Sequence, residues 1–127
     1  MTKERLEFYL NRKKSVFGFN TENDDKIVGW VKLFKRPPMS GLSFARFKEI
    51  AEPKMVEEQM KIKSEPYRVN IAQVTREIFD GDKFPDNEDY LLNVTYSFST
   101  LDDVERFLKE LGYDLADIKW GADFDFL

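Results

Sequence analysis

The stretch YLLNVTYSF, residues 90–98, carries the clearest strand signal in the chain and decides the class of fold. Its second half is rich in β-branched and aromatic side chains, which fit a pleated and half-buried surface. A helical pattern follows directly, because apolar residues recur at three- and four-residue spacing over residues 101–111. Thr100 can cap the first turn of this helix, and Gly112 stands where a helix commonly ends.

Toward the N-terminus, residues 15–35 favour a β-hairpin. Two apolar segments, around Phe17 and over residues 27–34, flank the polar run NTENDD, which is typical of a turn. We expect a short helix over residues 3–14 and a second that begins near Ser43 and ends before Pro53.

The pattern of residues 54–79 does not decide between a helix and a strand. The four-, three- and four-residue spacing of Tyr67, Ile71, Val74 and Ile78 is helical, whereas Tyr67, Val69 and Ile71 on their own suit a strand. No linker or internal repeat divides the chain. The sequence therefore predicts one small α+β domain over residues 1–127. Its antiparallel sheet should contain a hairpin at about 15–35 and a strand at about 90–98, packed by several short helices including about 101–111.

The residue types that are missing exclude several kinds of chemistry. The 127 residues include no cysteine and no histidine, so disulfides, thiolate nucleophiles, Cys/His zinc sites and imidazole catalysis are excluded. The acidic loop over residues 80–89 does not fit a calcium-binding EF-hand, because Phe84 and Pro85 occupy its fifth and sixth positions. We therefore expect no metal and no cofactor.

The N-terminal residues show no secretory signal, and the longest apolar run, residues 27–34, is interrupted by Lys32 and far too short to span a bilayer. We expect a cytoplasmic protein that does not enter the membrane.

Charge is divided unevenly along the chain. Residues 1–63 contain 14 Lys and Arg against 9 Asp and Glu, whereas residues 64–127 contain 6 against 15. Such asymmetry favours a charged partner. In the second half the carboxylates alternate with aromatic residues, a combination that suits capture of a basic protein: charge steers the encounter and desolvated rings retain the complex.

We therefore interpret the chain as a non-catalytic protein-binding module. The candidate contact residues are acidic residues of the second half and its tryptophan: Glu88, Asp89, Asp114, Asp117, Trp120, Asp123 and Asp125. In size, acidity and lack of a catalytic set the chain is similar to bacterial immunity proteins that neutralise toxins. That likeness implies an inhibitor of a basic toxin. The carboxylates of such an inhibitor stand in for the phosphates of the toxin's substrate.

Two other interpretations stay open at this point. The basic residues of the first half could bind nucleic-acid phosphates beside stacking aromatics, although the pI near 5.0 argues against it; they are Arg12, Lys13, Lys14, Lys35 and Arg36, with Phe17 and Phe19. Alternatively, two carboxylates could act as general acid and base in a hydrolase without histidine. The oligomeric state does not follow from the sequence.

Overall fold

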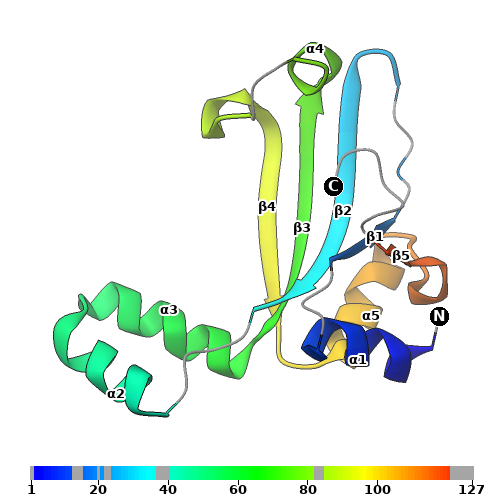
Figure 1. Ribbon diagram of the computed structural model, residues 1–127. Coiled ribbons are helices and arrows are strands. Elements are labelled where there is room, and N and C mark those ends of the chain that lie inside the picture. Colours follow the sequence, from blue (N-terminus) through cyan, green and yellow to red (C-terminus); the bar gives the residue numbers. More distant parts are fainter. Residues whose placement is uncertain are drawn as a thin grey trace.

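A five-stranded antiparallel sheet forms the centre of the computed structural model, which describes residues 2–12, 16–19, 21, 24–36, 41–81 and 85–120. The strand order is β4-β3-β2-β1-β5, so β5, the last strand, forms one edge of the sheet beside β1, and β4 forms the other (Figure 1). The strands are β1 (Phe17–Phe19), β2 (Ile27–Lys35), β3 (Tyr67–Thr75), β4 (Tyr90–Phe98) and β5 (Lys119–Trp120).

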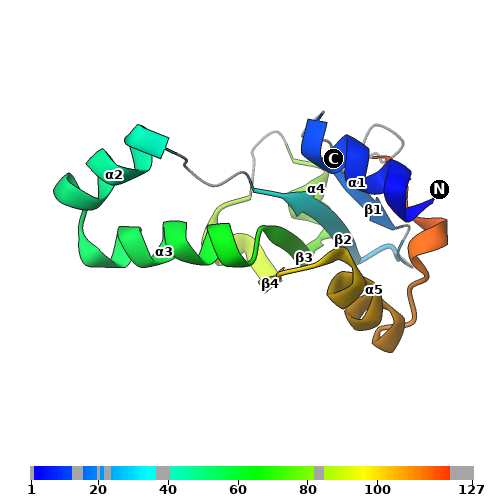
Figure 2. The same ribbon diagram turned by 90° about the horizontal axis from the view of Figure 1, so that it is seen from below.

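Short helices lie on the sheet and beyond it. They are α1 (Lys3–Arg12), α2 (Gly41–Ile50), α3 (Pro53–Ser64), α4 (Arg76–Phe79) and α5 (Leu101–Glu110), with single 3₁₀ turns at η1 (Asn87–Asp89) and η2 (Leu115–Asp117). Helices α1 and α5 pack on one face of the sheet, which we call the helix-covered face. The α2–α3 hairpin projects away from the sheet, past its β4 edge (Figures 1 and 2). No helix in the described part of the chain is long and apolar enough to cross a membrane.

The α+β class is confirmed, and so are the two predicted β elements, the strand over residues 90–98 and the hairpin over residues 15–35. The predicted strand coincides with β4, and the predicted hairpin is the β1–β2 pair, in which Phe17 lies opposite Leu33. The Thr100 hydroxyl accepts a hydrogen bond of 3.2 Å from the Asp103 amide and so caps α5, as expected.

The ambiguous segment divides into one helix and one strand. Residues 53–64 form α3, and residues 67–75 form β3, so the helical reading of Tyr67, Ile71 and Val74 is wrong. Tyr67, Arg68, Val69 and Asn70 are all buried because β3 lies inside the sheet and both of its faces are covered. A strand buried on both faces loses the alternation that would identify it in the sequence.

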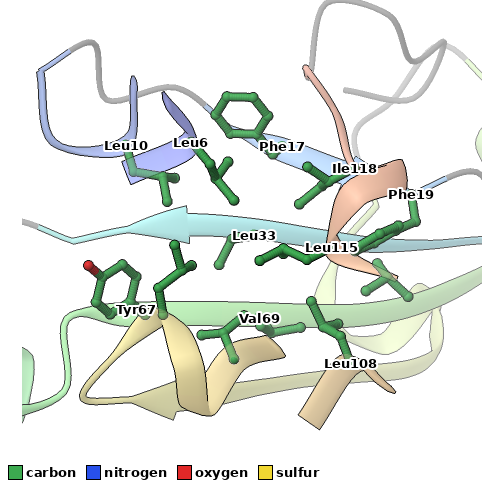
Figure 3. Close-up of a cluster of buried hydrophobic side chains, with 13 residues drawn as sticks. Leu6, Leu10, Phe17, Phe19, Leu33, Tyr67, Val69, Leu108, Leu115 and Ile118 are labelled. Atoms are coloured by element: carbon green, nitrogen blue, oxygen red, sulfur yellow. The ribbon is translucent and has the colours of Figure 1, made fainter. Parts of the chain in front are cut away.

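The main core fills the space between the helix-covered face and its helices (Figure 3). Helix α1 contributes Leu6 and Leu10, and α5 contributes Val104 and Leu108, all at most 2% exposed. They pack on strand residues such as Val69, and Leu115 and Ile118 on and after η2 complete the cluster. The core therefore joins residues from both ends of the described chain.

The opposite face of the sheet carries a polar network centred on the buried side chain of Asn70. Trp30 Nε1 donates to Asn70 Oδ1 at 3.0 Å, and Asn70 Nδ2 donates to Asn93 Oδ1 at 2.9 Å and to Thr95 Oγ1 at 3.1 Å. The network connects β2, β3 and β4 side chain to side chain. Beside it, burial lowers the pKa of Lys32, whose ammonium lies over the Trp30 ring.

Replacement of Leu108 by alanine tests the main core. Leu108 is fully buried, so Leu108→Ala should lower the free energy of unfolding by about 2–5 kcal/mol through lost burial and the resulting cavity. Leu111→Ala, one turn later at a side chain that is 46% exposed, should change it by no more than about 0.5 kcal/mol. Urea titration of both variants provides the measurement, and equal losses would contradict this description of the core.

Candidate functional site: an acidic groove

A groove of about 770 Å³ opens on the helix-covered face, between the C-terminal end of α5 and the β2–β3 ribbon. Helices α1 and α5 lie over one end of the sheet and leave the rest of this face uncovered (Figure 1). The apolar lining of the groove includes Phe19, Val31, Ile71 and Tyr113. Its charged lining residues are Asp24, Asp114, Asp117 and Lys119.

Asp24 is held at the groove by the turn that precedes β2. Its Oδ1 accepts hydrogen bonds from the backbone amides of Ile27, at 2.7 Å, and Lys26, at 2.8 Å. These two bonds, together with the nearby Arg76 guanidinium, lower the pKa of the Asp24 carboxyl. Arg76 also donates to the Asp24 backbone carbonyl at 3.0 Å. The turn therefore presents a fixed negative charge.

The end of α5 brings the second wall of the groove into place. Gly112 adopts a φ of +90°, which L side chains rarely adopt. The Gly112 amide donates to the Lys109 carbonyl at 3.0 Å, and the Tyr113 amide donates to the Leu108 carbonyl at 2.9 Å, which together form a Schellman motif. This turn reverses the chain and lays the Tyr113 ring against Phe19, with ring centres 5.0 Å apart.

Asp114 and Asp117 stand at the two ends of the tight turn η2. Asp114 Oδ1 accepts from the Ala116 amide at 3.0 Å and caps the turn. Side chains three residues apart lie on the same side of a 3₁₀ turn, so the two carboxylates share the groove wall. Leu115 and Ile118 are buried in the main core and anchor the turn to the sheet.

The charges of this arrangement suit the binding of a cation. Three carboxylates and one ammonium line the described part of the groove, which leaves an excess of negative charge beside apolar side chains. A general acid needs a raised pKa so that it holds a proton at neutral pH. The pKa of Asp24 is shifted in the opposite direction, which keeps this carboxylate ionised.

The structure separates the contact residues predicted from the sequence. Asp114 and Asp117 line the groove, and Trp120 directly follows the lining residue Lys119 with 52% of its surface exposed. Glu88 and Asp89 lie in η1 at the start of β4, the opposite edge of the sheet from β5, and do not line the groove. Asp89 accepts from the Asp86 amide at 2.8 Å and so stabilises its own turn. Asp123 and Asp125 lie outside the described residues.

Sequence reasoning missed Asp24, Phe19 and Tyr113 as groove residues. Asp24 belongs to the basic half of the chain and is brought to η2 only by the pairing of β1 with both β2 and β5. The dipeptide Gly112–Tyr113 was the one available signal, because a glycine that ends a helix determines where the next side chain points.

Four of the seven residues considered for nucleic-acid binding are buried or contact other side chains of the protein. Phe17 and Phe19 are 1% and 3% exposed, so neither ring can stack on a base. Lys35 donates to Asn11 and lies over the Tyr67 ring, and Arg36 pairs with Glu58 at 3.5 Å. Arg12 is exposed at the end of α1, whereas Lys13 and Lys14 lie outside the described residues.

Among the residues that the structure describes, no group of three or more acidic side chains is arranged to hold a metal ion. Comparisons of the chain with protein-family models, with curated proteins and with solved structures found no match.

The geometry of the groove wall can be tested at Gly112. Open space surrounds the position of a Cβ, so Gly112→Ala should cost only the backbone strain of a positive φ, about 1–2 kcal/mol of unfolding free energy. Asparagine tolerates this conformation better than alanine, so Gly112→Asn should be the less destabilised variant. Thermal unfolding monitored by circular dichroism would compare the two. Equal stability of Gly112→Ala and the wild type would show that the Schellman turn is not needed.

Proposed function

We propose that this protein is a non-catalytic binding module whose acidic groove captures a basic segment of another protein, and that this partner is a basic toxin domain that it neutralises. The observation that carries the proposal is the convergence of Asp24, Asp114 and Asp117 on one groove from distant parts of the chain. Such a concentration of like charge raises the encounter rate of an oppositely charged partner.

The apolar lining supports retention of a bound segment after the encounter. Tyr113 is half-buried and lies on Phe19, so its ring forms a fixed wall of the groove. Trp120 is exposed but does not line the groove. Rigid aromatic side chains supply much of the affinity in protein interfaces, because few rotatable bonds are immobilised on binding. A lysine or arginine side chain suits this lining, since its stem can pack on the Tyr113 ring while its cation meets the carboxylates.

A toxin that acts on nucleic acid carries a basic surface that binds phosphates. Carboxylates spaced about as closely as the phosphates of a nucleic acid compete for that surface and block access of the substrate. The proposal therefore expects the partner to lose its activity on binding, without any chemical step by this protein.

Neutralising two groove charges tests the site directly. Asp114→Asn/Asp117→Asn keeps the capping oxygen of residue 114 but removes both charges. With a fluorescein-labelled peptide of alternating lysine and leucine as the probe, the association rate at low salt should fall about tenfold. The matched control is Asp86→Asn/Glu88→Gln, which removes two charges at the opposite edge of the sheet and should bind like the wild type. Similar losses in both variants would mean that only net charge matters.

The identity of the partner can be tested by affinity capture from lysate of the native host. The wild type should retain a basic protein at low salt that the Asp114→Asn/Asp117→Asn variant loses, and adding the wild-type protein should inhibit that protein's activity. An acidic partner, or a basic one whose activity persists in the complex, would contradict the proposal. An association rate that does not change between low and physiological salt would contradict the steering mechanism.

A further inference from the structure

The outer edge of β4 is a nine-residue strand with no described strand beside it. In the described part of the chain β4 pairs only with β3, so its second row of backbone amides and carbonyls faces outward. The strand contains no charged residue and no proline, which are the usual means of protecting an edge from further pairing. A bulge opposite Gln73 and Val74 leaves residues 92–98 in regular register. Such an edge is a template for another strand.

Apolar side chains are exposed along this edge. Leu91 is 56% exposed, Tyr96 is 41% exposed and Leu92 is 39% exposed. The α2–α3 hairpin projects past the same edge in both views of the molecule (Figures 1 and 2) and carries three further exposed apolar residues: Ile50 at 77%, Met60 at 54% and Met55 at 52%. Edge strand and hairpin thus form two sides of a corner. Exposed apolar side chains gathered on neighbouring elements are typical of interaction sites.

Charge at the two ends of β4 indicates what fills this corner. Residues 85–89, which lead directly into β4, contain Asp86, Glu88 and Asp89 and no basic residue. At the other end of β4, Phe98 pairs with Tyr67, which follows α3. The last turn of α3 carries Lys61 and Lys63, and Glu65 after it accepts from the Ser97 hydroxyl of β4 at 3.5 Å, so these three residues leave one net positive charge at this end. In an antiparallel pair of identical strands, the start of each lies beside the end of the other. Self-pairing would therefore bring the acidic turn of each copy toward the lysines of its partner.

We propose that two copies of this chain associate through antiparallel pairing of their β4 strands about a two-fold axis at Val94, forming one continuous ten-stranded sheet. In this register Val94 faces Val94 of the second copy, and Leu92 faces Tyr96 on the helix-covered side. Asn93 faces Thr95 on the other side. Apolar residues meet apolar ones and polar residues meet polar ones, and no like charges oppose each other along the strands. The acidic groove lies toward the β5 edge, so this association does not depend on the proposed function.

The oligomeric state is the first test. Sedimentation velocity from about 1 to 200 µM should show the wild type shifting to twice the chain mass of 15.1 kDa. Leu92→Lys places a charge on the edge and should weaken the dimer at least tenfold. Leu111→Lys, at an exposed leucine after α5, is the matched control and should dimerise like the wild type. A monomer at every concentration overturns the proposal and leaves the edge to a strand of a different protein.

Cross-linking tests the register, and the absence of cysteine from the natural sequence makes its readout clean. Directly opposed residues of antiparallel strands have Cα atoms about 4.5–5.5 Å apart, within the range of a disulfide. Val94→Cys should therefore form a covalent dimer under mild oxidation, whereas Thr95→Cys, which would face residue 93, should do so far more slowly. A dimer in which Val94→Cys fails to cross-link overturns the proposed axis.

Two variants with altered charge test whether the acidic turn of one copy lies beside the lysines of the other. Lys61→Glu/Lys63→Glu and Asn87→Lys/Glu88→Lys should each weaken self-association severalfold at low salt, and the second variant leaves the contact between Asp86 and Asp89 in place. Mixing the two variants should give tighter association than either variant alone. One end of the heterodimer keeps the wild-type pairing of acids with lysines, and at the other end the substituted turn has no net charge and no longer repels the acidic α3 end. Circular dichroism establishes that each variant is folded. Failure of the mixture to associate more tightly than either variant alone overturns the assigned arrangement.

Discussion

The pairing of β2 with β3 supports every other part of this structure. Nine consecutive residue pairs, from Ile27 with Thr75 to Lys35 with Tyr67, join the two strands without interruption. On one face this ribbon is covered by the main core beneath α1 and α5. On the other, the Trp30–Asn70 hydrogen bond ties the same two strands together through side chains. A buried polar pair specifies register, because a slip of one residue would move Asn70 into the apolar core.

The two sides of this ribbon present different chemistry. Toward β5, the groove combines ionised carboxylates with aromatic walls, and its parts come from the turn before β2 and the chain after α5. Toward β4, the edge is uncharged and exposes a row of backbone hydrogen-bonding groups. The groove suits a cationic segment, whereas the edge suits an extended strand. A single sheet can therefore present two separate binding surfaces, one at each side.

The sequence reveals the parts of this fold whose signals are local. Residues 92–98 alternate visibly because one face of β4 carries Phe98 toward the main core and the other carries polar side chains, and α5 is recognisable from Thr100 and Gly112 at its two ends. β3 is ambiguous because burial on both faces removes its alternation. The same distinction holds for the groove: Asp114 and Asp117 are near each other in the chain and could be predicted together, whereas Asp24 joins them only through long-range pairing. Nor could charge alone show that Glu88 and Asp89 lie at the far edge.

The placement of β1 between β2 and β5 has a consequence for how the protein is made. Leu6 and Leu10 find their final neighbours only when Leu115 and Ile118 are available, because all four belong to one core cluster. During synthesis the first helix must therefore wait, with its apolar side exposed, while more than a hundred further residues emerge from the ribosome. Contacts this distant in sequence slow folding and lengthen the exposure of apolar surface.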